Sequence, residues 1–248
     1  MRVLQFLFFF ALATTTSLGL GGCKEDIAQP SVETPPHAEI LFMQAAPLAP
    51  GVDLYIDDKT VVTNATFGQF TTSYTETETG LHQVRIFPTG TTTTPLVDAT
   101  LNFTKSEHYT IFAVNNAAGT AINVLHFADN LTAPAPGKAH IRIAHLVSDG
   151  SKIKFSFRAT GKGPLFNDVP FMEKTEAFIP VDTGAVTMRV HAVGVSGGGM
   201  SGSGPDEVIT PDLPFTLESG GIYTIAVVGT IANDSAHMVV IKHERLHE

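Results

Sequence analysis

The sequence predicts an all-β protein with two tandem antiparallel β-sandwich domains of the immunoglobulin or transthyretin kind, preceded by a signal peptide and a tether. Three observations support this prediction. Hydrophobic residues make up 43% of the chain and charged residues 16%, with 22 glycines and no tryptophan, a composition typical of β-domains. Apolar residues alternate along short runs, and the chain repeats itself after roughly 100 residues.

The alternation is clearest in two runs that occupy equivalent places in the repeat. Val52, Leu54 and Ile56 share one face of the first run, and residues 153–157 repeat the pattern with Ile, Phe and Phe. Turn residues such as the pair Asp57-Asp58 separate such runs. Period two over short runs with turns between them indicates half-buried antiparallel strands.

The repeat divides the chain into domains. The segments that match between the copies are 38–42 with 139–143, 52–56 with 153–157, Phe67-Gly68 with Phe166-Asn167, 80–86 with 184–190, 101–104 with 213–216, and 109–111 with 223–225. A unit of this length is a domain rather than a solenoid repeat. We therefore predict domains at 38–130 and 138–248, each with its own core, joined by a linker at 131–137 that reads Leu-Thr-Ala-Pro-Ala-Pro-Gly.

Residues 1–22 have the features of a secretory signal peptide. Arg2 gives a positive end, and the apolar run Val3–Ala13 is too short to span a bilayer, which takes about 20 helical residues. The run 20–22, Leu-Gly-Gly, precedes Cys23 and resembles the bacterial lipobox. Cys23 is the only cysteine of the chain, so we predict that it is lipidated and that the membrane is a partner through this anchor.

Residues 23–37 are predicted to be the lipidated cysteine and a flexible tether, because they are polar, acidic and contain prolines. Lys24 is not the aspartate that resembles an inner-membrane retention signal in Gram-negative bacteria. The stretch 24–26, Lys-Glu-Asp, is similar to a short export signal to the cell surface, and its alternative is a plain solvated tether. The expected localisation is the outer membrane, lipid-anchored, with exposure at the cell surface left open.

The first copy resembles a large family of bacterial extracellular domains of unknown function. The resemblance rests on residues 44–57, on Phe67-Gly68, on the strand 80–84 and on the strand 109–114. The repeats of that family open with a His-Ala-Ser-Pro-Asp-Ala-Pro-like stretch, followed by a Val-Asp-Val-Tyr-Val-Asp-Gly-like hairpin. The second copy departs from this pattern, since it keeps a histidine, His145, but lacks the prolines. The resemblance implies a β-sandwich on a secreted or surface-anchored protein, and it implies no reaction.

Two enzyme-like motifs overlap in one Ser/Gly run. Residues 194–198 fit G-x-S-x-G around Ser196, and residues 197–202 fit G-x-G-x-x-G. Both motifs require a strand that leads into a helix, whereas this run leads towards another strand. A flexible hairpin loop is therefore the favoured interpretation.

A third motif, His243-Glu244-x-x-His247, fits the zinc-protease pattern H-E-x-x-H. The pattern works on a helix, but residues 237–242 read as a strand, on which the two histidines would stand about 13 Å apart. The upstream residues that remain as a third ligand are His126 and Glu218. We predict no metal, and His243, Glu244 and His247 remain weak candidates for one.

Two further candidate sites have low specificity. Asp53, Asp57 and Asp58 could bind calcium, although aspartates at a hairpin turn are common without a metal. The tripeptide 234–236, Asp-Ser-Ala, resembles a short bacterial O-glycosylation site, which makes Ser235 a candidate for modification.

The formal net charge of −9 argues against nucleic acid as a partner, because no basic face is available for phosphates. We predict a lipid-anchored envelope or surface protein that is not an enzyme, needs no cofactor and acts as a binding or display module. Its ligand would be a glycan, a matrix protein or an envelope partner. The alternatives are a metal-dependent hydrolase that uses His243, Glu244 and His247, and a purely structural spacer.

Overall fold

The computed structural model describes residues 36–150, 154–159, 164–173, 177–193 and 208–244. These residues form strands β1 to β16 and one 3-10 turn, η1 (Ser148–Gly150), and they contain no α-helix. No helix of this part of the chain is long and apolar enough to cross a membrane. The predicted all-β fold class with two sandwiches is confirmed.

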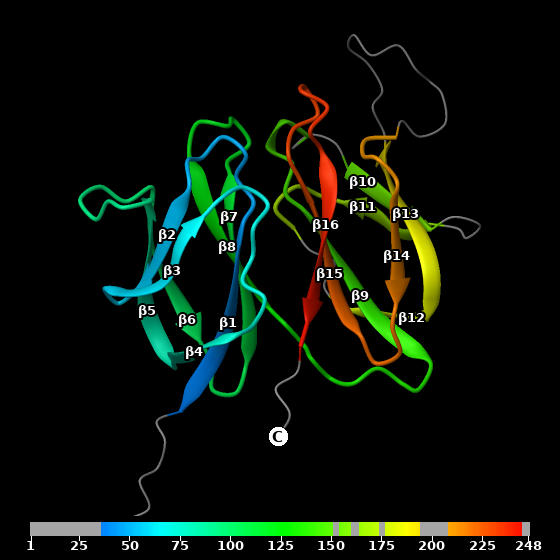
Figure 1. The fold of residues 1–248 in the computed structure, drawn as a ribbon, viewed down its shortest axis with the longest axis horizontal. Helices are drawn as coiled ribbons and strands as arrows, with labels where there is room; N and C mark the ends of the chain where they lie inside the picture. Colours follow the sequence, from blue (N-terminus) through cyan, green and yellow to red (C-terminus); the bar gives the residue numbers. More distant parts are fainter. Residues whose placement is uncertain (1–35, 151–153, 160–163, 174–176, 194–207, 245–248) are drawn as a thin grey trace, which may run out of the picture. The chain divides into compact units, whose positions relative to one another are not determined.

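The first copy is a sandwich of two four-stranded sheets, ordered β4-β1-β7-β8 and β3-β2-β5-β6 (Figure 1). Its strands are β1 (His37–Gln44), β2 (Val52–Ile56), β3 (Lys59–Ala65), β4 (Thr75–Glu78), β5 (Gly80–Pro88), β6 (Val97–Phe103), β7 (His108–Asn115) and β8 (Ile122–Ala128). As predicted, alternate residues of β2 point inward, since Val52, Leu54 and Ile56 all lie in the core. The turn Asp57-Asp58 has φ angles of 45° and 66°, the left-handed pair that a tight hairpin of this twist requires.

The second copy repeats this topology strand for strand, with sheets β12-β9-β15-β16 and β11-β10-β13-β14. Its strands are β9 (Lys138–His145), β10 (Lys154–Ala159), β11 (Pro164–Val169), β12 (Ile179–Asp182), β13 (Gly184–Val193), β14 (Leu213–Leu217), β15 (Ile222–Val228) and β16 (His237–His243). The run at 194–204 that carries the two glycine motifs lies outside the described residues, as does the connection 160–163 between β10 and β11.

One strand pair in each copy is parallel rather than antiparallel. β1 runs parallel to β7, with Ile40 opposite Tyr109, and β9 runs parallel to β15, with Ile141 opposite Tyr223. Alternation of apolar residues indicates which face of a strand is buried, but it does not indicate the direction of the neighbouring strand. The prediction of antiparallel strands throughout therefore missed the two parallel pairs. The prediction of a sandwich is unaffected by this difference.

The register of β14 differs by two residues from the sequence alignment. Gly80 lies opposite Phe103, and its counterpart Gly184 lies opposite Leu217, so Leu217 rather than Phe215 corresponds to Phe103. The tyrosine hydroxyls agree with this register: Tyr109 accepts the N–H of Thr104 at 3.1 Å, and Tyr223 accepts that of Glu218 at 3.2 Å. A shift by two keeps the same face of a strand inward, so an apolar pattern alone cannot detect it.

Three apolar cores hold the described strands together. Each sandwich has a core of its own, one around Leu54 and Ile111 and the other around Phe157 and Ile225. A third core, here called the shared cluster, contains side chains from both copies. Its buried members are Leu41, Met43, Ala45, Phe112, Val114, Phe127, Ala144, Leu146, Ala226, Val228 and Ile241.

The sheets β4-β1-β7-β8 and β12-β9-β15-β16 are here called the inner sheets. The shared cluster explains why they are buried on both faces. All seven residues of β15 and seven of the eight in β1 are buried. One face of each inner sheet packs into its own sandwich, and the other face packs into the shared cluster. Residues 35–248 accordingly form one unit. The domain limits stated above remain a prediction, with the strands of the first copy ending at Ala128 and those of the second beginning at Lys138.

Candidate functional site

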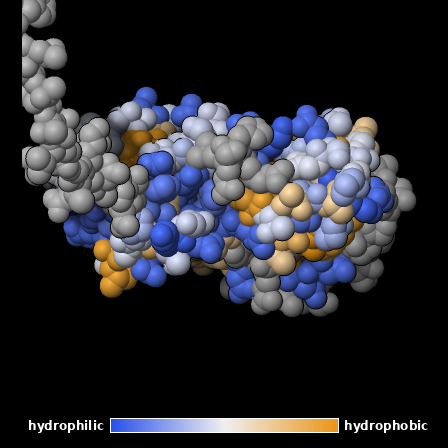
Figure 2. All heavy atoms as spheres, turned by 90° about the horizontal axis from the view of Figure 1, so that it is seen from below, coloured by the Kyte–Doolittle hydropathy of each residue, from blue (hydrophilic) through white to orange (hydrophobic). Residues whose placement is uncertain are grey.

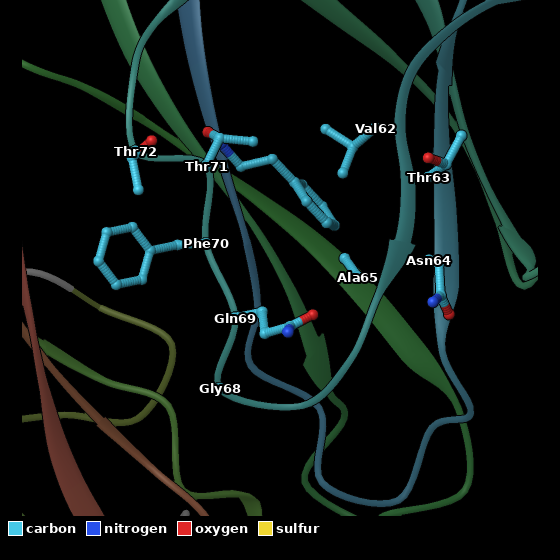
Figure 3. A pocket seen from close by; sticks show the side chains of 10 residues that line it. Val62, Thr63, Asn64, Ala65, Gly68, Gln69, Phe70, Thr71 and Thr72 are labelled. Atoms are coloured by element: carbon cyan, nitrogen blue, oxygen red, sulfur yellow. The ribbon is translucent and has the colours of Figure 1, made fainter.

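A cleft of about 520 Å³ opens at one side of the first copy (Figure 3). Residues 62–65 of the edge strand β3 lie on one side of it, and residues 68–72 of the connection between β3 and β4 lie on the other. Phe42 of β1, which is only 1% exposed, contributes to the lining from within the sandwich. The cleft therefore lies at an open side of the sandwich, where β3 and β4 are the edge strands of the two sheets.

The cleft is lined by apolar and neutral polar side chains. The apolar ones are Phe42, Val62, Ala65 and Phe70, and the polar ones are Thr63, Asn64, Gln69, Thr71 and Thr72. None of the ten lining residues is charged. Such a site offers hydroxyl and amide groups to a ligand but no partner for an ionic group.

Hydrogen bonds donated by backbone N–H groups fix both sides of the cleft. The Thr71 N–H donates to the Phe42 carbonyl at 2.9 Å, and the Gly68 N–H donates to the Gln44 carbonyl at 2.8 Å. On the other side, the Asn64 N–H donates to Asp53 Oδ1 at 2.7 Å. Asn64 has a φ of 51°, in the left-handed region, and the pairing of β3 with β2 is irregular there. A bulge therefore interrupts β3 beside the cleft.

A second cleft, of about 530 Å³, lies on the second copy along residues 182–187 and 214–216. Its lining includes a carboxylate, Asp182, which accepts a hydrogen bond from Lys138 Nζ at 2.7 Å. The two clefts therefore differ in chemistry, and only the first is free of charged side chains.

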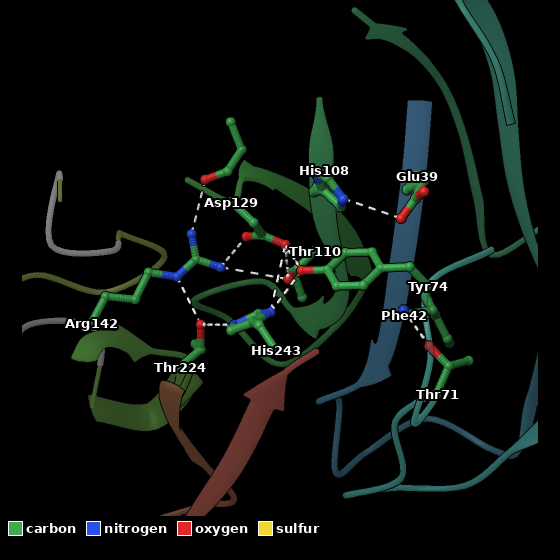
Figure 4. A network of polar contacts seen from close by, with 11 residues as sticks. Glu39, Phe42, Thr71, Tyr74, His108, Thr110, Asp129, Arg142, Thr224 and His243 are labelled. Atoms are coloured by element: carbon green, nitrogen blue, oxygen red, sulfur yellow. Dashed lines mark hydrogen bonds and ion pairs between the residues drawn. The ribbon is translucent and has the colours of Figure 1, made fainter. Parts of the chain in front are cut away.

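A buried polar network lies beside the shared cluster and joins the two copies (Figure 4). Arg142 of β9 pairs with Asp129, and both side chains are almost completely buried, at 1% and 0% exposed. Further donors of Arg142 are engaged as well, because Nε donates to Thr224 Oγ1 at 2.8 Å and Nη1 donates to the Ala128 carbonyl at 2.9 Å. Such additional hydrogen bonds make a buried charge pair tolerable.

Tyr74 and His243 complete this network. The Tyr74 hydroxyl donates to Asp129 Oδ2 at 2.7 Å and lies 2.7 Å from His243 Nδ1. Since its one proton goes to Asp129, it accepts the proton of Nδ1, and His243 Nε2 then accepts the hydroxyl proton of Thr224 at 2.6 Å. The network therefore assigns a neutral His243 with its proton on Nδ1.

The pKa directions agree with this assignment. Burial lowers the pKa of His243 from 6.5 to about 4, and this effect outweighs the opposing charge of Asp129. Burial, followed by the negative charge of Asp129, raises the pKa of Tyr74. Both groups are thus neutral near pH 7.

The network occupies equivalent positions of the two copies. Leu41 lies opposite Thr110 in one inner sheet, and Arg142 lies opposite Thr224 in the other, so Arg142 stands where the first copy has Leu41. A charged residue within an apolar strand, at a position where the other copy has a leucine, was a sequence signal for a buried polar group. Nothing comparable marked Tyr74 or Asp129, which come from connecting segments.

Of the H-E-x-x-H motif, the structure describes His243 and Glu244. His243 is the last residue of β16, which confirms the predicted strand, and both of its ring nitrogens are engaged. Glu244 follows as an exposed residue, and His247 lies outside the described residues. His126 Nε2 contacts the Asn102 carbonyl at 3.2 Å. Glu218 binds Lys242 Nζ at 2.6 Å, and the described residues contain no group of three or more His, Cys, Asp or Glu that could hold a metal.

The three aspartates proposed as calcium ligands serve separate roles. Asp53 accepts backbone N–H groups on both carboxylate oxygens, from Asn64 and, at 2.9 Å, from Gly90. Asp57 binds the ring of His82, and Asp58 pairs with Arg85. The bond to His82, followed by one from the backbone of Gln83, lowers the pKa of Asp57. Each of the three carboxylates therefore has a structural partner in or near the hairpin of β2 and β3.

Ser235 lies in an exposed turn before β16, and its hydroxyl is already engaged. Its Oγ accepts the Thr230 N–H at 3.1 Å and lies 2.9 Å from Thr230 Oγ1. Asp234, with a φ of 50°, forms the turn. Glycosylation of Ser235 stays a prediction, as does lipidation of Cys23, which lies outside the described residues.

The comparisons with known proteins agree with the family resemblance of the first copy. A model of the DUF4397 family, a domain of unknown function, matches residues 38–156. The match covers the first copy, with its cleft, and extends to β9 and into β10 of the second.

The description of the DUF4397 model names no activity, and no curated protein matches the chain. Among solved structures, a leucine-rich repeat protein from Bacteroides thetaiotaomicron VPI-5482 matches 79% of this chain with 10% identity and a TM-score of 0.20. The chain spans about a quarter of that protein, 26% of its length. At this TM-score the likeness carries no argument about fold or function.

Proposed function

We propose that this protein is a lipid-anchored, non-catalytic binding module of the bacterial cell envelope that holds a neutral glycan in the cleft of its first copy. The anchor is Cys23, and the residues between it and β1 act as the tether that carries the domains away from the outer membrane. The observation that carries the proposal is the lining of the cleft, which combines buried apolar side chains with neutral hydroxyl and amide groups.

The size and chemistry of the cleft favour a small uncharged ligand with many hydroxyl groups. A volume of about 520 Å³ is within the range of small-ligand sites. Thr63, Gln69 and Thr72 offer donors and acceptors at the exposed rim, and the apolar side chains can contact the C–H faces of a sugar ring. An ionic ligand would lose its hydration without gaining a charged partner.

An extended peptide is a poorer fit to the same cleft. Peptides often bind by adding a strand to an exposed sheet edge, which needs a regular row of free backbone groups. The bulge at Asn64 interrupts β3 at this place. A broad protein contact also has little support on the face shown in Figure 2, where hydrophilic residues predominate and hydrophobic residues occur in separate spots.

The hydrolase alternative loses its main support. A metal ligand needs a free lone pair on a ring nitrogen, whereas His243 has its proton on Nδ1 and the hydroxyl of Thr224 at Nε2. The spacer alternative differs from our proposal only in having no ligand, so a binding experiment separates the two.

The test uses residues 24–248 without the lipid and a panel of neutral and acidic oligosaccharides built on glucose, mannose, galactose and N-acetylglucosamine. We expect binding of neutral members, measured by titration calorimetry. The double variant Thr63→Val/Thr72→Val keeps the shape of the rim but removes two hydroxyls, which should weaken binding about tenfold or more. Thr100→Val, an equally exposed threonine of β6 outside the cleft, is the matched control.

Two results would contradict the proposal. If no neutral oligosaccharide binds, the spacer interpretation takes its place. If a neutral oligosaccharide binds and the double variant binds it as tightly as the control does, the ligand site lies elsewhere on the molecule.

A further inference from the structure

One wall of the cleft also belongs to the contact between the two copies. This shared wall, residues 66–74, leads from β3 to β4, and its residues 68–72 line the cleft. Three of its aromatic side chains, those of Phe67, Phe70 and Tyr74, pack against the shared cluster. The same short segment therefore faces a ligand site on one side and the second copy on the other.

Specific contacts tie the shared wall to the second copy. The ring of Phe67 packs edge-on against His237 of β16, with centroids 5.8 Å apart. The Tyr74 hydroxyl lies 2.7 Å from His243 Nδ1 at the end of the same strand. Figure 4 shows Tyr74 reaching from the first copy into the buried network, next to the Thr71–Phe42 hydrogen bond. Two side chains of the wall are thus held by a strand that is distant in sequence.

The backbone of the wall is attached to β1. The N–H groups of Gly68 and Thr71 donate to carbonyls of β1, and the Gln44 N–H donates to the Gln69 carbonyl at 2.9 Å. β1 itself packs on the shared cluster through Leu41 and Met43. Both attachments of the wall therefore lead to the contact between the copies.

We propose that the packing of the second copy sets the geometry of the cleft, so that ligand binding in the cleft and packing of the two copies are energetically coupled. The coupling is reciprocal: loosening the contact between the copies opens the wall and weakens binding, and a bound ligand stabilises the contact. This inference adds a regulation to the site named under the proposed function and rests on that function for its ligand.

Tyr74→Phe tests the coupling because it removes only the hydroxyl that reaches Asp129 and His243. The first measurement is amide hydrogen exchange of residues 24–248 without a ligand. We expect Gly68 and Thr71 to exchange about tenfold faster, relative to Ile111 of β7, which corrects for a change in global stability. Tyr109→Phe is the matched control, since it removes a tyrosine hydroxyl of the same copy that contacts Thr104 instead of the second copy.

The second measurement is the affinity for the tightest neutral oligosaccharide of the panel described above. We expect Tyr74→Phe, which changes no lining residue, to weaken binding about tenfold, and Tyr109→Phe to leave it unchanged. Unchanged relative exchange at Gly68 and Thr71 would overturn the inference, whether or not a glycan binds. Normal glycan affinity in Tyr74→Phe would also overturn it, while leaving the proposed function intact. If no oligosaccharide binds, the proposed function fails, and the exchange measurement still decides whether the second copy holds the wall.

Discussion

At the scale of single residues, the buried pair Arg142–Asp129 is the most constrained feature of the described chain. Both side chains are removed from water, and each makes further hydrogen bonds: Asp129 accepts from the Thr110 hydroxyl, and Arg142 donates to Thr224. Such a pair adds little net stability compared with apolar residues, but breaking it leaves one buried charge without a partner.

Arg142→Met should therefore lower the free energy of unfolding by about 3–5 kcal/mol, because Asp129 stays buried and charged without its partner. Chemical denaturation monitored by circular dichroism measures the change. The double variant Arg142→Met/Asp129→Asn should recover part of the loss, since it removes the orphaned charge. Equal stabilities of the wild type and Arg142→Met would show that the pair is hydrated in solution.

His243 makes stability dependent on pH. Its pKa is about 4 in the folded protein and 6.5 as a free side chain, so between these values the unfolded chain binds a proton that the folded chain does not. The stability from this group is present above pH 6.5 and is lost as the pH falls towards 4, by about 3 kcal/mol in total. Denaturation at several pH values should show a steeper slope in this window for the wild type than for His243→Gln. An NMR titration of the His243 ring midway near pH 6.5 would contradict the prediction.

At the scale of strands and sheets, the sequence was sufficient where a rule is local. Alternation identified β2 and its hairpin, and the strand His237–Lys242 was predicted almost to the residue, since β16 is His237–His243. The alignment of residues 38–42 with 139–143 gave the correct equivalence of β1 and β9. What failed was information that depends on a neighbour: the parallel pairing of β1 with β7 and the two-residue shift of β14.

The candidate site was beyond prediction for the same reason. The cleft is made by residues of β3 and of the connection that follows it, and their sequence, rich in threonine, resembles an ordinary polar loop. The network brings Tyr74 to His243 across most of the chain length, and no spacing rule connects them. Only Arg142, a charge within an apolar strand, could have been singled out as a buried polar residue in need of partners.

The inner sheets also determine how the first copy behaves alone. A fragment of residues 38–130 would expose the side chains that it contributes to the shared cluster, among them Leu41, Met43, Phe112 and Phe127, and Asp129 would lack Arg142. We expect the fragment to self-associate or to unfold at a clearly lower temperature than the full chain. Analytical ultracentrifugation and thermal circular dichroism measure both outcomes. A monomeric fragment that melts at the temperature of the full chain would mean that the shared cluster contributes little.

At the scale of the whole molecule, the proposed function requires that the folded part is held at a membrane. Cys23→Ala should abolish incorporation of a fatty-acid analogue and leave the protein soluble or unprocessed, because the variant lacks the thiol that receives the lipid. Metabolic labelling followed by membrane fractionation measures this, with Thr100→Val as a control that leaves the amino-terminal region unchanged. Full labelling of Cys23→Ala would place the lipid elsewhere or remove the anchor from the proposal.

The shared cluster also bears on how such a chain can arise. Both copies use the same sheet for the contact, as two identical subunits do when they pair through the same surface. At equivalent steps of the register, however, the first copy has Met43 beside Phe112, where the second has Ala144 beside Ala226. Duplication of an ancestor that paired with itself would explain why both copies use the same sheet. Later substitutions would explain why large side chains of the first copy stand where the second copy has small ones. Each copy covers this face of the other, so the face is not available to a further copy while the contact is formed.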